Sequence, residues 1–179
     1  MPDAALQLDA QQMEALLQRL CQQVLDQTGP DESLVLLGIR TRGLPIAERL
    51  AGLLSTRLGK PVPLGVLDIT LYRDDLVEKA GVPIVRPTEI PFSLKGCTVV
   101  LVDDVLYTGR TIRAALDALL DHGRPRRVRL LVLVDRGGRE LPIHADVTGL
   151  KLDVPTTHRI SVKLKEIDGE DAVLLESLD

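Results

Sequence analysis

Two adjacent carboxylates and a hydroxyl-rich turn lie within one short segment of the chain. Asp103 and Asp104 follow the apolar run 99–102, and the sequence Thr-Gly-Arg-Thr occupies positions 108–111. A helix that begins at such a turn offers unpaired N–H groups and a positive dipole end, which suit a phosphate. Carboxylates accept hydrogen bonds from paired hydroxyls and can orient Mg²⁺ through its waters. The segment therefore predicts a site for ribose 5-phosphate, with the acids on the sugar hydroxyls and the turn on the phosphate.

The same pattern has a plainer explanation, because acids before a helix often act only as caps or as partners of its dipole. The Thr-Gly-Arg-Thr turn at this spacing favours the phosphate site. The sequence contains no G-x-x-x-x-G-K-[ST] or G-x-G-x-x-G phosphate motif, and no Ser/His/Asp or Cys/His arrangement for covalent catalysis.

The segment must be positioned by an alternation of apolar runs and amphipathic stretches. Strands are predicted at 34–37, 62–69, 98–102 and 128–134, and helices at 10–27, 44–58 and 111–122. Such alternation predicts an α/β fold with a mainly parallel central sheet flanked by helices. The carboxyl ends of its strands meet at one edge, where ligands usually bind. Weak alternation at 160–164 and 173–175 predicts one or two antiparallel strands.

Residues 72–91 contain three prolines, mixed charges and no periodicity. A stretch of this length is too long for an ordinary connection, so we expect a flexible lid or a protruding hairpin.

Composition limits the classes of function. The chain has 179 residues, a net charge of −4 and only 2% aromatic residues, which does not favour a general nucleic-acid binder. Any RNA contact must come from a local basic patch. Two cysteines form no metal or disulfide framework, and no apolar run is long enough to span a membrane. We therefore expect a cytoplasmic protein without a membrane partner.

On segment 99–111 the chain resembles the type I phosphoribosyltransferases. Three further stretches, 38–43, 68–75 and 134–143, resemble the uracil-using branch of that family that also regulates the pyrimidine operon. The resemblance extends from about residue 7 to residue 175. It implies one domain over residues 1–179, with a core at about 30–135, a lid loop at about 72–91, and a small hood from the C-terminal part and the N-terminal segment.

The resemblance implies a reaction of uracil with phosphoribosyl pyrophosphate (PRPP) to give UMP and pyrophosphate. It places Arg73, Asp103 and Asp104 in catalysis, with Mg²⁺ held through PRPP and the two acids acting on it indirectly. The implied PRPP and UMP contacts are Arg40, Thr41, Arg42, Val99, Val100, Leu101, Val102, Asp103, Asp104, Val105, Leu106, Tyr107, Thr108, Gly109, Arg110 and Thr111. The implied base hood is formed by Asp135, Arg136 and Gly137.

Judged without the resemblance, several of these residues have plainer explanations. Arg40 and Arg42 could be solvated loop charges, Arg73 could pair with a neighbouring aspartate, and Asp135 could be a turn former.

The resemblance also implies binding of pyrimidine-operon messenger RNA under control of UMP or UTP, through a basic face of a homodimer or higher homo-oligomer. Arg19, Thr41 and Arg139 stand where relatives carry similar residues, whereas Gly138 and His144 replace a usual histidine and a usual arginine. Losing cations weakens RNA affinity. Two alternatives therefore stay open, an enzyme that has lost RNA binding and a sibling transferase that uses another base.

Overall fold

The computed structural model describes residues 4–75 and 81–178. Its centre is a five-stranded, fully parallel sheet in the order β3-β2-β4-β5-β6. The strands are β2 (Leu34–Ile39), β3 (Leu64–Leu67), β4 (Thr98–Leu106), β5 (Arg127–Asp135) and β6 (Val147–Lys151). The predicted α/β fold with a parallel sheet is confirmed, although β6 was not anticipated.

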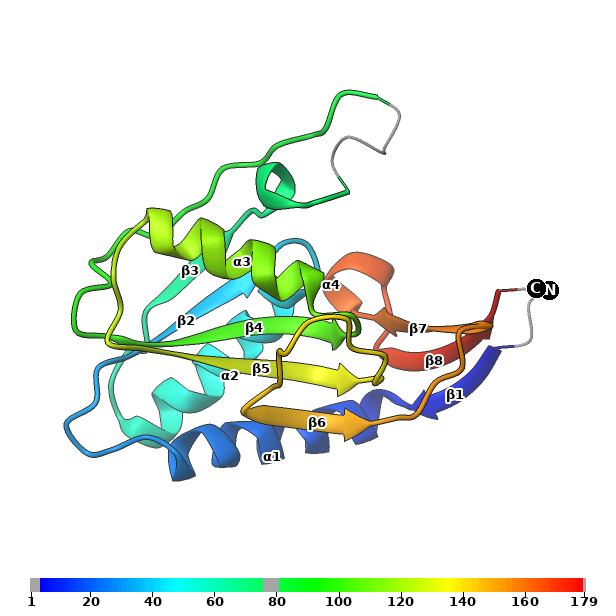
Figure 1. The fold of residues 1–179 in the computed structure, drawn as a ribbon. Coiled ribbons are helices and arrows are strands. Elements are labelled where there is room, and N and C mark those ends of the chain that lie inside the picture. Colours follow the sequence, from blue (N-terminus) through cyan, green and yellow to red (C-terminus); the bar gives the residue numbers. More distant parts are fainter. Residues whose placement is uncertain (1–3, 76–80, 179) are drawn as a thin grey trace.

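Three helices cover the two faces of the sheet (Figure 1). They are α1 (Ala10–Asp26), α2 (Gly43–Leu58) and α3 (Arg110–Asp121). Side chains of β4 alternate between the faces, as expected for a strand. Val100 and Val102 pack in the cluster that contains α1 and α2, and Val99 and Leu101 pack in the cluster that contains α3. Both faces are therefore buried, which explains why the strands read as continuous apolar runs.

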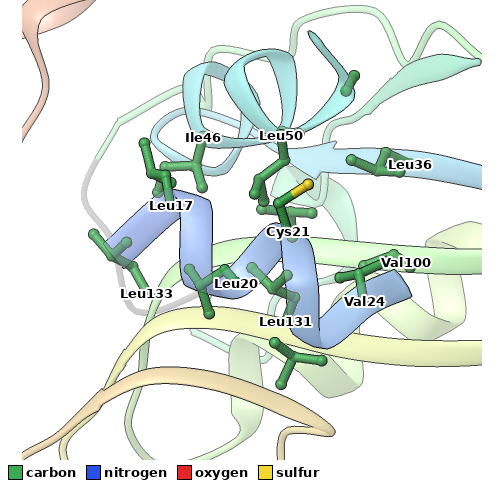
Figure 2. Packing of buried hydrophobic residues seen from close by; sticks show 14 of the residues in the cluster. Leu17, Leu20, Cys21, Val24, Leu36, Ile46, Leu50, Val100, Leu131 and Leu133 are labelled. Carbon is green, nitrogen blue, oxygen red and sulfur yellow. The ribbon is translucent and has the colours of Figure 1, made fainter. Parts of the chain in front are cut away.

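Helix α1 shows how the sequence fixes the position of an element. Asp9 and Gln12 form a reciprocal capping box, with hydrogen bonds of 2.8 and 2.9 Å between each side chain and the other residue's backbone N–H. One stripe of the helix is buried, and Figure 2 shows Leu17, Leu20 and Cys21 from this stripe packed beneath α2 and against the sheet. Apolar burial of this kind stabilises the helix far more than its own propensity does.

A second, smaller sheet lies beside the carboxyl ends of the main strands (Figure 1) and is built from the segments of the expected hood, so we call it the hood. Its antiparallel strands, in the order β1-β8-β7, are β1 (Ala4–Leu8), β7 (His158–Lys163) and β8 (Ala172–Ser177), and the short α4 (Lys165–Asp168) connects β7 to β8. Strands β7 and β8 confirm the weak C-terminal alternation, whereas β1 was not predicted. Val162, Leu164 and Val173 join the same buried cluster as α1 and α2, so the hood shares a core with the main sheet.

The segment between β3 and β4 projects away from the sheet (Figure 1). It begins with the short 3-10 helix η1 (Thr70–Tyr72), and its described residues continue without regular structure, apart from one bridge between Val66 and Glu89. The buried Asp68 accepts N–H groups from Thr70 at 2.8 Å and from Arg86 at 2.7 Å. The Asp68 carboxylate thus links the residues just before the expected lid to Arg86 in its second half. Residues 76–80 of the lid lie outside the described part of the chain.

Candidate functional site

Three loops meet at the carboxyl edge of the central strands. The first follows β2 and holds residues 40–42, the second follows β4 and holds residues 107–109, and the third follows β5 and begins at Arg136. Adjacent parallel strands β2, β4 and β5 bring these loops together, although they are distant in sequence.

The two acids lie inside β4, which corrects the expectation that the strand ends before them. Pairing with β5 continues to Leu106 opposite Asp135, and this pairing extends the strand past the acids. Asp103 is buried and Asp104 is half-buried. The Asp103 carboxylate accepts the N–H of Asp104 at 2.9 Å, and the Asp104 carboxylate accepts the N–H of Val105 at 2.8 Å.

Burial sets the electrostatics of this pair. Desolvation, followed by the charge of Asp104, raises the pKa of Asp103 well above its usual value. Desolvation also raises the pKa of Asp104, and the charge of Arg42 works against this rise. Two buried carboxyl groups with raised pKa values need a ligand with hydroxyl donors or a nearby cation to stabilise their ionised forms.

The turn after β4 is the segment for which the sequence predicted a phosphate site. Gly109 has φ of 93°, which a side-chain-bearing residue rarely adopts, and α3 begins directly after it. The Thr108 hydroxyl accepts the N–H of Arg110 at 3.3 Å. A cavity of about 300 Å³ lies over this turn, lined by residues 105–112 together with Arg73, Asp74 and Asp75.

The loop after β2 is held close to the acids by two glycines. A Cβ on Gly43 would lie 2.3 Å from the carbonyl oxygen of Val102, and a Cβ on Gly38 would lie 2.6 Å from the Cα of Leu44. The start of α2 therefore packs on the backbone of β4 immediately before Asp103. The peptide bond between Arg40 and Thr41, within this loop, is cis.

A second cavity, of about 220 Å³, adjoins the loop after β2. Its lining includes Arg40, Arg73 and Arg86, the hydroxyl-bearing Thr41 and Thr70, and one acid, the buried Asp68. Arg73 lines this cavity and also the one over the phosphate turn. The Nε of Arg40 is buried and lacks a hydrogen-bond partner within the described residues. A cavity with three guanidinium groups suits a polyphosphate.

Sequence reasoning missed Arg86. It lies in the irregular segment, where an arginine looks like a solvated charge. The hydrogen bond from its backbone N–H to Asp68 leaves no pattern in the sequence. Arg73 hydrogen bonds to Asp75 at 2.8 Å through two nitrogens. The plainer explanation of Arg73 as a partner for a neighbouring acid therefore holds in this structure, while the residue still lines both cavities.

The segment predicted to cover the base follows β5. Arg136 is buried, its guanidinium lies 3.9 Å from the centre of the Tyr107 ring, and it donates to the carbonyl of His158 at 3.1 Å. Gly137 donates its N–H to Asp135 at 3.0 Å. The structure thus packs this segment on the phosphate turn and links it to the hood.

The three residues assigned to RNA lie on different elements. Arg19, in α1, donates to the carbonyl of Gly149, and Thr41 is exposed in the loop after β2. Arg139 donates to Ile143, Tyr107 and Asp135 and leaves only 18% of its side chain exposed. Its guanidinium is therefore already engaged within the chain.

The donor set fits Mg²⁺ only in company with a substrate. Within residues 4–75 and 81–178, no three His, Cys, Asp or Glu side chains group to hold a metal ion. Asp103 and Asp104 supply two adjacent carboxylates, and Mg²⁺ commonly keeps several waters while binding one or two carboxylates and substrate phosphates.

Over the same described residues, no helix is long and apolar enough to cross a membrane.

The fold and the match to a family model define the class of protein. The model for the phosphoribosyl transferase domain matches residues 5–166. Among solved structures, the hypoxanthine phosphoribosyltransferase of Trypanosoma cruzi aligns with a TM-score of 0.69 over 96% of both chains at 17% identity. A hypoxanthine-guanine phosphoribosyltransferase from Bacillus anthracis aligns with a TM-score of 0.68 over 98% of this chain and 99% of its own, at 15% identity. At these identities the structures show the shared fold alone.

Curated relatives are similar over nearly their whole length. Proteins named Bifunctional protein PyrR from Thermus thermophilus and Pelotomaculum thermopropionicum are 54% and 52% identical, each over 94% of this chain and 93% of the relative. The namesake from Deinococcus radiodurans is 52% identical over 94% of this chain and 92% of its own. The chain belongs to the phosphoribosyltransferase family and, within it, to the PyrR group. The resemblance inferred from the sequence is confirmed, and the chain is a phosphoribosyltransferase.

Proposed function

We propose that this chain transfers the ribose 5-phosphate unit of PRPP to uracil. The bond from the anomeric carbon to the pyrophosphate oxygen breaks, and a bond from that carbon to a ring nitrogen of uracil forms, with loss of the nitrogen's proton. UMP and pyrophosphate are the products. The observation that carries the proposal is that Asp103 and Asp104, near the end of β4, directly precede residues 105–112, which line the first cavity. Arg73, whose charge acts on Asp103, lines both this cavity and the arginine-lined one.

Each part of PRPP has a matching group in the chain. The turn at 108–111 offers helix N–H groups and hydroxyls to the 5-phosphate. Asp103 and Asp104 accept the ribose hydroxyls. Arg40, Arg73 and Arg86 line the cavity where the pyrophosphate would lie, because that cavity adjoins the loop after β2.

The chemistry rests on positioning and charge rather than on a proton relay. Bound Mg²⁺ would neutralise charge on the leaving pyrophosphate, and Asp103 and Asp104 would hold its waters together with PRPP. Arg73 would stabilise the departing group, since it lines both cavities. Preorganised cations and an oriented sugar lower the barrier without any covalent intermediate.

Uracil as the base is supported by the stretches 68–75 and 134–143, which resemble the uracil-using branch, and by membership of the PyrR group. The test is pyrophosphate release from PRPP and Mg²⁺ with uracil, hypoxanthine or orotate. Release with uracil alone is expected, and release with another base but not uracil would overturn this choice. Asp103→Asn should lower kcat/KM, whereas Asp26→Asn, at a residue that accepts a hydrogen bond from Gln22 on α1 and lies outside both cavities, is the matched control.

We further propose that the chain binds pyrimidine-operon messenger RNA when UMP or UTP is abundant. The relatives are named bifunctional proteins, which supports a second role beside catalysis. A filter-binding assay with leader RNA, with and without UMP, tests this role. Retention that rises with UMP and falls with salt is expected. No retention at low salt would leave the enzyme-only alternative.

A cytoplasmic location and a homodimer or higher homo-oligomer complete the proposal. Sedimentation of the purified chain tests the assembly, and a monomer at micromolar concentration would contradict it.

A further inference from the structure

Arg139 lies at the centre of the contacts between the base segment and the phosphate turn. Its Nε donates to the carbonyl of Ile143 at 2.7 Å, one terminal nitrogen donates to the carbonyl of Tyr107 at 2.8 Å, and the other contacts the Asp135 carboxylate at 2.5 Å. All three nitrogens of the guanidinium are therefore engaged within the chain. Asp135 is the last residue of β5, and Tyr107 directly follows β4.

The partners of Arg139 come from both the base segment after β5 and the phosphate turn after β4. Asp135 and Ile143 flank the loop predicted to cover the base, and Tyr107 belongs to the turn predicted to hold the 5-phosphate. The Asp135 side chain is only 16% exposed, and its other oxygen accepts the N–H of Gly137. A charge-assisted pair with this little exposure holds its geometry better than a surface ion pair.

Backbone contacts run alongside this side-chain link. Glu140 and Leu141 both donate their N–H groups to the carbonyl of Thr108, at 2.9 and 3.1 Å. The N–H of Arg136 bonds to the carbonyl of Leu106 at 3.1 Å. The two loops are consequently docked over their length, and Arg139 adds a side-chain link beside the exposed ion pair of Arg110 with Glu140.

Packing at the glycines of both loops leaves little space for relative movement. A Cβ on Gly138 would lie 2.4 Å from the Tyr107 ring, and a Cβ on Gly109 would lie 3.3 Å from Ile143. Arg136 covers the Tyr107 ring from the base loop. The distance between the bound 5-phosphate and the bound base is thus set by how these two loops dock.

We propose that Arg139 is a positioning residue of the transferase site, which fixes the base loop to the phosphate turn, rather than primarily a contact for RNA. The inference rests on the proposed function, because it assigns the base and the 5-phosphate to these two loops. Arg139 acts through Asp135 and Tyr107 and is not placed against the reacting atoms.

The test compares Arg139→Gln, Arg139→Lys and Asp135→Asn with the wild-type chain. Arg139→Gln removes the charge and most of the hydrogen-bond donors of the guanidinium, so the KM for uracil and for PRPP should each rise about tenfold. Arg139→Lys keeps one charged contact to Asp135 and should lie between the wild type and Arg139→Gln. Asp135→Asn combined with Arg139→Gln should be no worse than the more affected single variant, because both remove the same link.

The readouts separate positioning from a general loss of folding. A fraction of unfolded enzyme lowers kcat but leaves KM unchanged, so the rise in KM with a thermal midpoint close to that of the wild type is the diagnostic result. Arg159→Gln is the matched control, since the Arg159 side chain is 63% exposed, pairs with Glu176 on the hood and lies outside both cavities. It should leave both KM values unchanged.

The binding of PRPP, measured by calorimetry with Mg²⁺, keeps the inference testable if uracil is the wrong base. A wild-type chain that binds PRPP but does not use uracil would refute the substrate, while weaker PRPP binding by Arg139→Gln would still support the positioning role. If Arg139→Gln keeps kcat, both KM values and PRPP affinity within twofold of the wild type, the inference is overturned, whether or not RNA retention falls.

Discussion

The guanidinium of Arg42 and the carboxylate of Asp168 are joined by two hydrogen bonds, of 2.6 and 3.2 Å, which connect the start of α2 to α4 in the hood. Asp168 also accepts the N–H of Leu164 at 2.9 Å. Arg42 ends the loop proposed to face the pyrophosphate, and its charge acts on Asp104. This contact therefore holds the loop after β2, residues 40–42, to the hood.

A double-mutant cycle should measure this contact. Arg42→Gln and Asp168→Asn each break the same pair, so their effects on the free energy of unfolding should be less than additive, with a coupling of about 1 kcal/mol. The modest value reflects the partial exposure of Arg42, whose side chain is 33% accessible. Urea unfolding of the four proteins gives the coupling, and strictly additive effects would show that the pair contributes nothing.

The acids of the hood predict how stability depends on pH. Hydrogen bonds from Arg49 lower the pKa of Glu166 and Asp171, and the hydrogen bond from Arg42 lowers the pKa of Asp168. A depressed pKa means that the unfolded chain binds protons first as the pH falls. The stabilisation is therefore complete above the ordinary carboxyl pKa of about 4 and is lost as the pH drops through the lower folded values.

Arg49→Gln isolates this effect, because Arg49 bonds to both Glu166 and Asp171 at 2.6 to 2.9 Å. At pH 7 the variant should be less stable by roughly 2 kcal/mol. The difference from the wild type should shrink as the pH falls below the ordinary carboxyl pKa of about 4, because the acids then protonate. Thermal unfolding across this range checks the prediction, and a difference that stays constant with pH would contradict it.

Asp103→Asn should separate activity from stability. The change removes a charged acceptor for the ribose hydroxyls, so kcat/KM should fall roughly 10- to 100-fold. Burial and Asp104 raise the pKa of Asp103, so its ionised form destabilises the folded chain at neutral pH. The thermal midpoint at pH 7.5 should therefore stay the same or rise. A lower midpoint together with unchanged kcat/KM would mean that Asp103 serves the fold rather than the substrate.

The main elements of the fold could be predicted because burial leaves a clear pattern in the sequence. Strands β2, β4 and β5 are covered on both faces and so read as apolar runs, and α1 carries both an apolar stripe and a capping box. Strand β6 escaped detection because only Val147 is fully buried within it, and β1 because its residues are exposed or half-buried. Edge strands of this kind lack the pattern on which prediction depends.

The candidate site divides in a similar way. The placement of the acids just before a turn that opens a helix could be predicted, since they lie in one continuous segment with a chemical pattern, and their role in binding stays a prediction. The internal partners of Arg42 and Arg139 could not, because ion pairs with Asp168 and contacts to backbone carbonyls depend on how distant segments dock. Arg86 was missed for the same reason, since its placement rests on the fastening to Asp68.

Two glycines of α2 give a matched test of how closely the start of this helix packs on β4 beside the acids. A Cβ on Gly43 would lie 2.3 Å from the Val102 carbonyl oxygen and 3.3 Å from the Cα of Asp103, whereas nothing lies within 4 Å of a Cβ on Gly52. Gly43→Ala must push the start of α2 away from β4, at a cost of about 1–3 kcal/mol in the free energy of unfolding. Gly52→Ala should instead stabilise the chain by about 0.5–1 kcal/mol, because alanine favours a helix interior.

The same pair should differ in catalysis. Moving the start of α2 displaces Thr41 and Arg42 relative to Asp103, so Gly43→Ala should raise the KM for PRPP in the fraction that remains folded, while Gly52→Ala should leave it unchanged. Urea unfolding and PRPP titration on the same preparations measure both effects. A clash at 2.3 Å must move either α2 or the strand that carries the acids. Equal stability and equal KM for the two variants would therefore show that the packing of α2 on β4 does not set the position of the loop after β2.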